Sequence, residues 1–84
     1  MRALKYTELA LDDIAEIYRY LSREASAAVA KRVVLRLRLR ARKCRDAPFQ
    51  GVARPEYGAS CRFLLSGQYF IYFDVSDESV TILR

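Results

Sequence analysis

Apolar residues recur at three- and four-residue steps in the first quarter of the chain, which predicts an amphipathic helix ending near Ser22. Thr7 precedes this stretch and suits an N-cap, because its hydroxyl can accept an amide hydrogen of the first turn. The short, partly alternating segment 2–6 predicts an edge strand before the helix. The apolar stripe of this first helix consists of Ala10, Ile14, Ile17, Tyr18 and Leu21.

A second helix is predicted from a cap at Ser26 to about Arg45, because Pro48 forbids its continuation. Residues 35–42 alternate strictly between apolar residues and arginine, as a half-buried strand would. A strand of about twenty residues would lie far outside the usual range, and the flanking alanines favour a helix. On a helical wheel one arc of this helix must face the core. Its members are Ala30, Val33, Val34, Leu37, Ala41 and Cys44.

A second, narrower apolar line, Ala28, Leu35 and Leu39, falls almost opposite that arc. A helical hairpin cannot bury both lines, so either another part of the sheet or a partner protein covers the second one. The third interpretation is that these residues are ordinary exposed leucines, which are common on protein surfaces. Arginines border the line, with Arg32, Arg36 and Arg40 along one edge and Arg38 and Arg42 along the other.

The last third of the chain carries three strand patterns after a loop, 46–59, that holds both prolines and two of the three glycines. The strands are predicted at Ser60–Leu65, Tyr69–Asp74 and Ser79–Leu83. Their short connections can join only antiparallel neighbours, so they form a β-meander. The predicted fold is therefore α+β: an N-terminal strand, an antiparallel pair of helices and a three-stranded meander.

The middle strand of this meander is apolar on both faces, as a central strand covered on both sides would be. The two helices can cover only one of these faces. A partner protein would explain the other, although tyrosine hydroxyls could equally reach water there. Tyr69, Ile71 and Phe73 point one way, and Phe70 and Tyr72 point the other.

Length and charge set the broad class of the protein. A chain of 84 residues with 52% hydrophobic side chains makes one modest core, so residues 1–84 form a single domain. The formal charge is +5, and twelve of the fifteen cationic residues are arginine. Arginine grips carboxylates and phosphates through paired donors. Acidic protein, RNA and DNA are the natural partners, and a merely soluble basic surface is the alternative.

Several kinds of chemistry are excluded by residues the chain lacks. Without histidine there is no Ser/His or Cys/His nucleophile and no helical His metal motif. Cys44 and Cys61 have neither metal-site nor redox-pair spacing, so reduced thiols are expected, and neither a metal nor a cofactor. There is no apolar run of membrane length and no signal-peptide pattern. The expected location is the reducing cytoplasm, away from membranes.

Taken in order, the motifs resemble those of the RelE/ParE family of bacterial toxin-antitoxin toxins over nearly the whole chain. After the first strand come a helix with an Ala-x-x-Asp-Ile spacing and a long basic helix. A Pro/Gly loop and three short strand motifs follow. The motifs that carry this resemblance are Ala10-x-x-Asp13-Ile14-x-x-Ile17-x-x-Tyr20-Leu21, Cys61-Arg62-Phe63, Tyr69-x-Ile71-Tyr72 and Val80-x-Ile82-Leu83-Arg84.

The resemblance implies a toxin held inactive in a hetero-oligomer with a cognate antitoxin, a ParD-like protein of ribbon-helix-helix type. Such an antitoxin lays extended or helical segments along the helices and the sheet of the toxin. That would account for the second apolar line and for the two-sided middle strand. The residues assigned to the antitoxin are Ala28, Arg32, Leu35, Arg36, Arg38, Leu39, Arg42, Phe70 and Tyr72.

The resemblance also offers two activities. RelE-like toxins cleave mRNA on the ribosome, for which Arg62, Arg84 and Tyr72 are the first candidates here, with Arg54, Tyr57 and Tyr69 behind them. ParE-like toxins poison DNA gyrase and are not known to catalyse a reaction. In that branch Arg62 and Arg84 would contact the target.

Departures from the RelE pattern favour the ParE-like branch. Leu64 and Phe70 stand where RelE-like toxins carry basic residues, and the chain has no tail beyond Arg84 to supply further catalytic groups. That end also leaves open a shortened family member that only binds an antitoxin. Arg62 beside Phe63 is the ParE-like pattern. The structural alternatives are pairing of Arg62 with Asp74 or Glu56, and a cap or salt-bridge role for Asp13.

Overall fold

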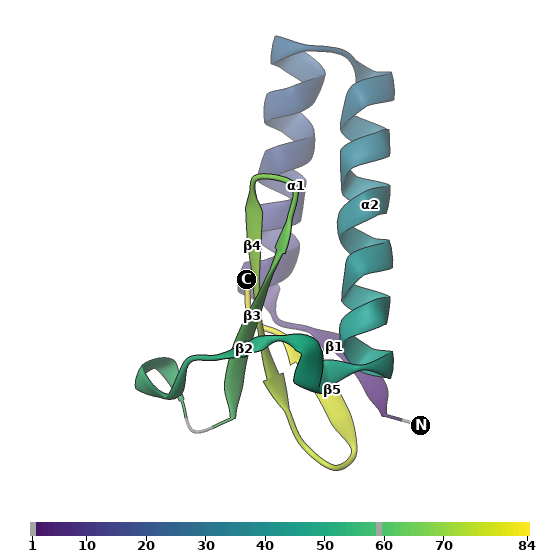
Figure 1. The fold of residues 1–84 in the computed structure, drawn as a ribbon. Helices are drawn as coiled ribbons and strands as arrows, with labels where there is room; N and C mark the ends of the chain where they lie inside the picture. Colours follow the sequence, from purple (N-terminus) through teal and green to yellow (C-terminus); the bar gives the residue numbers. More distant parts are fainter. Residues whose placement is uncertain (1, 59) are drawn as a thin grey trace.

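A pair of helices lies on one side of a five-stranded sheet, and the β3–β4 hairpin rises beside the helices (Figure 1). The computed structural model describes residues 2–58 and 60–84, and of Tyr57 it describes the backbone only. The helices are α1 (Glu8–Glu24) and α2 (Ala27–Asp46), and two short 3-10 helices are η1 (Pro48–Gln50) and η2 (Pro55–Tyr57). The strands are β1 (Ala3–Tyr6), β2 (Val52–Ala53), β3 (Cys61–Ser66), β4 (Tyr69–Val75) and β5 (Ser79–Ile82).

Both predicted N-caps are confirmed. The Thr7 hydroxyl accepts a hydrogen bond from the Ala10 amide at 3.0 Å, and the Ser26 hydroxyl accepts one from the Val29 amide at 3.1 Å. Each bond satisfies an amide that the first helical turn leaves without a partner. The helices extend only one or two residues beyond their predicted ends, because helix ends depend on local signals that the sequence displays.

The sheet has the order β1-β5-β4-β3-β2. The predicted meander is confirmed, since β4 pairs antiparallel with both β3 and β5. The N-terminal strand is an edge strand as predicted, and it pairs in parallel with β5, with Leu4 opposite Val80 and Tyr6 opposite Ile82. Strand β2 was missed by the loop prediction for 46–59. It has two residues and exists only because Val52 and Ala53 meet β3.

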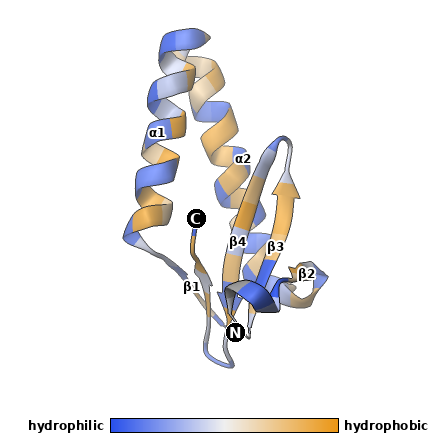
Figure 2. Ribbon diagram, turned by 90° about the vertical axis from the view of Figure 1, so that its left-hand side faces the viewer, coloured by the Kyte–Doolittle hydropathy of each residue, from blue (hydrophilic) through white to orange (hydrophobic). Residues whose placement is uncertain are grey.

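The core lies between α2, the near side of α1 and one face of the sheet. Phe73, Val80 and Cys44 are the largest fully buried side chains. In Figure 2, hydrophobic stretches colour parts of α1, α2, β3 and β4. Gly51 lies against this core, where a Cβ atom would come within 2.6 Å of Phe73 Cζ and 3.2 Å of the Phe63 carbonyl oxygen. The close approach of η1 to the sheet therefore requires glycine at this position.

Candidate functional site

The alternation of side chains along β3 and β4 assigns the candidate catalytic residues to opposite faces of the sheet. Arg62 is the cross-strand partner of Phe73, which is fully buried on the face that the helices cover. Tyr72 precedes Phe73 and therefore points to the other face. The structure does not bring Arg62 and Tyr72 together.

Three aromatic rings form a cluster on the face of the sheet that the helices do not cover. Phe63, Phe70 and Tyr72 have ring centroids 5.5 to 6.2 Å apart. The guanidinium of Arg54 lies 4.4 Å from the centroid of the Phe63 ring. Phe70 is 53% exposed, which is high for a ring in the middle of a sheet. We call these three rings the aromatic cluster.

A groove of about 350 Å³ runs between α1 and the adjacent edge of β4. The pairing register joins β5 only to the second half of β4, Phe73–Val75. By the alternation of antiparallel bonds, the N–H and C=O of Phe70 point toward this unpaired edge. Apolar side chains line the groove, and Asp13, Glu16 and Arg84 stand among them. Phe70 and Tyr72 belong both to this edge groove and to the aromatic cluster.

The second apolar line of α2 is exposed, as its opposition to the core arc predicts. Leu35 is 58% exposed and Leu39 is 48% exposed, and Ala28 is exposed as well. We call these three residues the outer stripe. They face away from the core, whereas Phe70 and Tyr72 lie beyond the core on the far face of the sheet. The residues assigned to the antitoxin from the sequence therefore form two separate surfaces.

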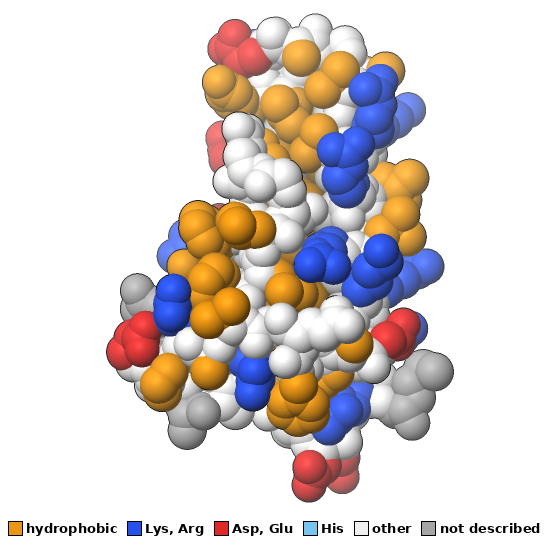
Figure 3. All heavy atoms as spheres, in the orientation of Figure 1, with side chains coloured by type: hydrophobic (Ala, Val, Ile, Leu, Met, Phe, Trp, Pro, Cys, Tyr) orange, Lys and Arg blue, Asp and Glu red, His pale blue; other side chains and the backbone are white. Residues whose placement is uncertain are grey.

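The arginines along the two edges of the outer stripe have different surroundings. The guanidinium of Arg38 lies 5.5 Å from the ring centroid of Tyr6 in β1, so that edge faces the first strand. Arg36 lines a hollow with Gly67 and Gln68, so the other edge faces the tip of the β3–β4 hairpin. Blue side chains follow α2 in the space-filling view of Figure 3.

The two residues assigned to a target are held by different contacts. Arg62 donates a hydrogen bond of 2.7 Å to the Gly51 carbonyl oxygen and lies 4.9 Å from the Phe49 ring centroid. Its expected structural partners are bound elsewhere, since Asp74 accepts from Ser60 and Glu56 pairs with Arg54. The alternative prediction, an ion pair of Arg62 with Asp74 or Glu56, is therefore wrong.

Arg84 lies on the groove side of the sheet. Its Nε is 3.5 Å from the Asp13 carboxylate, which gives Asp13 the salt-bridge role that the sequence suggested. The backbone carbonyl of Arg84 accepts from the Tyr72 amide at 3.2 Å. Arg84 and Tyr72 are thus neighbours, and Arg62 is separate from both. Tyr69 lines the same groove, whereas the side chain of Tyr57 lies outside the described residues.

The two cysteines are free and buried. Burial raises the pKa of Cys44 to about 11, and burial also raises the pKa of Cys61, with the Asp74 and Glu56 carboxylates adding to the shift. Neither thiol is a ready nucleophile near neutral pH. Residues 2–58 and 60–84 contain no group of three His, Cys, Asp or Glu side chains that could hold a metal ion. Within the same residues, no helix is long and apolar enough to cross a membrane.

One feature of the loop was missed from the sequence. Phe49 is 64% exposed at the end of the molecule, with the Arg2 and Arg62 guanidiniums 5.6 and 4.9 Å from its ring centroid. We call these three residues the Phe49 platform. An aromatic residue between Pro48 and Gly51 in a polar loop was the available signal. Its flanking arginines come from segments distant in the sequence, so the sequence could not show the grouping.

Comparisons with known proteins agree with this fold. The sequence matches the family described as "ParE toxin of type II toxin-antitoxin system, parDE" over residues 4–84. The structure is similar to a solved structure described as "Chromosomal ParDE TA system from P. aeruginosa", with a TM-score of 0.84 and 24% sequence identity. The similarity covers 100% of this chain and 92% of that chain. At this identity the likeness shows the fold. No curated protein matches the sequence.

Proposed function

The chain belongs to the ParE toxin family of type II toxin-antitoxin systems, and from that premise we propose that it inhibits DNA gyrase and is neutralised by its cognate antitoxin. The toxin acts in the cytoplasm, where gyrase works, and forms a hetero-oligomer with a ParD-like antitoxin. It acts by binding and uses neither a cofactor nor a metal. Arg84 and Arg62 are the proposed contacts with the target.

The observation that carries a binding role is the separation of Arg62 from Tyr72 on opposite faces of the sheet. General acid-base cleavage of RNA requires its groups within hydrogen-bond reach of one scissile phosphate. Arg84 does lie beside Tyr72, but its guanidinium contacts Asp13. This arrangement supports a protein-binding toxin over the ribosome-dependent endoribonuclease alternative.

We further propose that the antitoxin occupies both exposed apolar surfaces. A helical segment with apolar and acidic faces suits the outer stripe, because Leu35 and Leu39 are bordered by arginines on each side. An extended segment suits the edge groove, because the β4 edge at Phe70 offers backbone donors and acceptors beside an apolar lining. One antitoxin chain must wrap around the toxin to reach both surfaces.

Inhibition of gyrase is tested by supercoiling of relaxed plasmid with purified gyrase and increasing amounts of the chain. We expect supercoiling to stop while relaxation of the same plasmid by a type I topoisomerase continues. The second reaction detects inhibition caused merely by coating of the DNA. Gyrase that works normally at toxin concentrations that stop growth would refute the proposal. New mRNA ends after induction would instead indicate the endoribonuclease.

The role of Arg84 is tested with Arg84→Gln, with Arg19→Gln as the matched control. Both arginines are exposed, and each pairs with a carboxylate of α1, Asp13 and Glu16 respectively. If Arg84 contacts the target, its substitution weakens inhibition roughly tenfold, as loss of an interfacial arginine can. Arg19→Gln leaves inhibition unchanged. Equal effects of the two substitutions would exclude a specific contact at Arg84.

The antitoxin surface is tested by calorimetry with the antitoxin encoded beside the toxin gene. The variant Leu35→Ala/Leu39→Ala should weaken binding roughly tenfold or more, because each substitution removes apolar surface that the antitoxin would bury in the complex. The matched control is Leu9→Ala/Leu11→Ala on α1, whose leucines are similarly exposed, at 48% and 44%. Unchanged affinity for the α2 variant would remove the outer stripe from the interface.

A further inference from the structure

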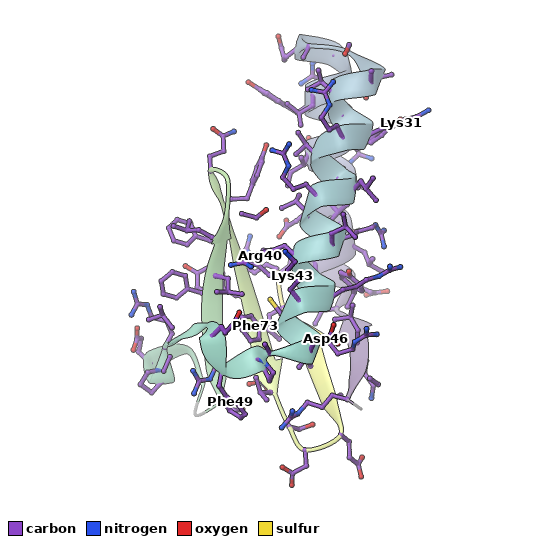
Figure 4. All side chains as sticks on the ribbon, turned by 45° about the vertical axis from the view of Figure 1, so that its right-hand side comes forward. Lys31, Arg40, Lys43, Asp46, Phe49 and Phe73 are labelled. Atoms are coloured by element: carbon purple, nitrogen blue, oxygen red, sulfur yellow. The ribbon has the colours of Figure 1, made fainter. Side chains whose placement is uncertain are left out.

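One edge of α2 carries a straight row of cations. Arg32, Arg36, Arg40 and Lys43 follow one another at steps of four, four and three residues, which places them on one side of the helix about 4.5 to 6 Å apart along its axis. We call this row the basic ridge. Figure 4 shows Arg40 on the side of α2 toward the β3–β4 hairpin, and Lys31 pointing away from it.

The charge of α2 is almost entirely uncompensated. The helix has eight Lys and Arg residues and one acidic residue, Asp46. In the part of the chain that the structure describes, Arg45 alone among these cations has a carboxylate within salt-bridge distance, and that carboxylate belongs to Asp46. Like charges four residues apart destabilise an isolated helix. A row of unpaired cations is therefore costly to the fold and favours an anionic partner.

The Phe49 platform continues the positive surface past the C-terminal end of α2. Arg2 Nε donates to the Ser76 carbonyl oxygen at 2.8 Å, and Arg62 donates to the Gly51 carbonyl oxygen at 2.7 Å. Backbone acceptors hold both guanidiniums in place without neutralising their charge. The two arginines line a hollow of about 260 Å³ with Phe49, and Asp77 adds one negative charge to its lining.

We propose that the basic ridge and the Phe49 platform together bind a single strand of nucleic acid. Cations in a line match a phosphate backbone, and the binding does not depend on base sequence. An exposed aromatic ring flanked by arginines provides a surface on which an unpaired base stacks. This surface lies beside the outer stripe and includes Arg32 and Arg36, so a bound antitoxin would cover part of it. The proposal does not depend on inhibition of gyrase.

The length of the surface fits a short strand rather than a single nucleotide. The ridge from Arg32 to Lys43 rises by about 16 Å along the helix, and Phe49 lies beyond its lower end (Figure 4). A free nucleotide could reach only one part of this surface. An oligonucleotide can contact both parts at once, so binding should strengthen with length until both are occupied.

The ridge is tested by fluorescence anisotropy with labelled dT20 and the 84-residue chain at several salt concentrations. The variant Arg32→Gln/Arg36→Gln/Arg40→Gln should weaken binding roughly tenfold or more and reduce the salt slope by about two, at about 0.7 per phosphate contact. The control is Lys31→Gln/Arg38→Gln/Arg42→Gln, which removes the same charge from the other edge of α2. An equal loss of affinity in both variants would show that net charge alone drives binding, and would overturn the proposed role of the basic ridge.

The platform is tested with Phe49→Ala against Tyr20→Ala, since Tyr20 is a second exposed ring beside an arginine, at the far end of the molecule. We expect Phe49→Ala to weaken binding of dT20 about tenfold and Tyr20→Ala to leave it unchanged. The RNA oligomer U20 should bind like dT20, and a 20-base-pair duplex should bind less tightly because its bases are stacked. Tighter binding of the duplex, or preference for a polyglutamate of equal charge, would overturn the proposal. Circular dichroism confirms that each variant is folded.

Discussion

On the face of the sheet that the helices cover, Phe73 is fully buried, whereas on the opposite face Phe70 exposes 53% of its surface. The two rings belong to the same strand and lie only three residues apart. Their difference comes from the alternation of side chains and from the helices covering one face only. The covered face contributes Phe73 to the buried core, whereas the Phe70 ring on the open face is accessible to a partner. We therefore propose that stability depends mainly on the covered face and that the open face is available to a partner.

The largest effect is expected from Phe73→Ala on the covered face. Removing a fully buried ring leaves a cavity between α2 and the sheet, which costs about 3 to 5 kcal/mol of unfolding free energy. The total unfolding free energy of a small domain is only about 5 to 15 kcal/mol. Urea unfolding followed by circular dichroism measures the loss. If Phe73→Ala and Phe70→Ala cost the same, the two faces do not differ in the way proposed.

A smaller loss is expected from Gly51→Ala, which adds volume to the covered face. The new Cβ would meet Phe73 Cζ at 2.6 Å, so the ring or η1 must move, at a cost of about 1 to 3 kcal/mol. The same substitution made together with Phe73→Leu should cost less, because the smaller side chain leaves room. A double-mutant cycle measured in urea gives this coupling. Independent, additive losses would mean that the clash with Phe73 is not the cause.

These contrasts also explain what the sequence could and could not predict. Helices α1 and α2 follow from local spacing and from caps at Thr7 and Ser26, which act within one turn. Strand β2 and the parallel pairing of β1 with β5 depend on partners far along the chain. Local patterns carry no information on such contacts, so these features were absent from the prediction.

The candidate site shows the same division. The outer stripe was predicted, because the period of a helix fixes which residues oppose the core. The face of the sheet to which Arg62 points was not predicted, because a shift of one residue in strand register moves every side chain to the other face. Its contact with the Gly51 carbonyl depends further on the position of η1. Residues within one element, on α2 or along β4, could therefore be grouped from the sequence, and residues of different strands could not.

On the open face, Phe70→Ala should affect binding more than stability. We expect a loss of stability under about 1 kcal/mol, mainly from the ring contacts with Phe63 and Tyr72. Affinity for the antitoxin should fall roughly tenfold, as for a central aromatic anchor. Calorimetry and urea unfolding on the same sample separate the two effects. A normal antitoxin affinity would exclude Phe70 from the interface, whatever its effect on stability.

The smallest effect is expected in the reactivity of the two thiols. Their alkylation rates compare the two faces without a substitution that disturbs the fold. Cys44 belongs to the core of the covered side, and its pKa is raised to about 11 because burial disfavours the thiolate. Cys61 is the cross-strand partner of Asp74 and so belongs to the open face. Because iodoacetamide reacts with the thiolate, Cys44 in the folded protein should react far more slowly than an ordinary cysteine at pH 8.

The raised pKa of Cys44 also sets the direction in which pH changes the stability of the fold. The folded state holds the Cys44 proton more tightly than the unfolded state, so this contribution to stability is complete below pH 9. It declines as the pH rises from about 9 toward about 11. Mass spectrometry of peptides from the alkylated protein gives the rate at each cysteine, with the urea-unfolded chain as the reference. We expect Cys44 to be protected more than Cys61. Faster alkylation of Cys44 would mean that the covered face opens more readily than the open face, contrary to the division of roles between them.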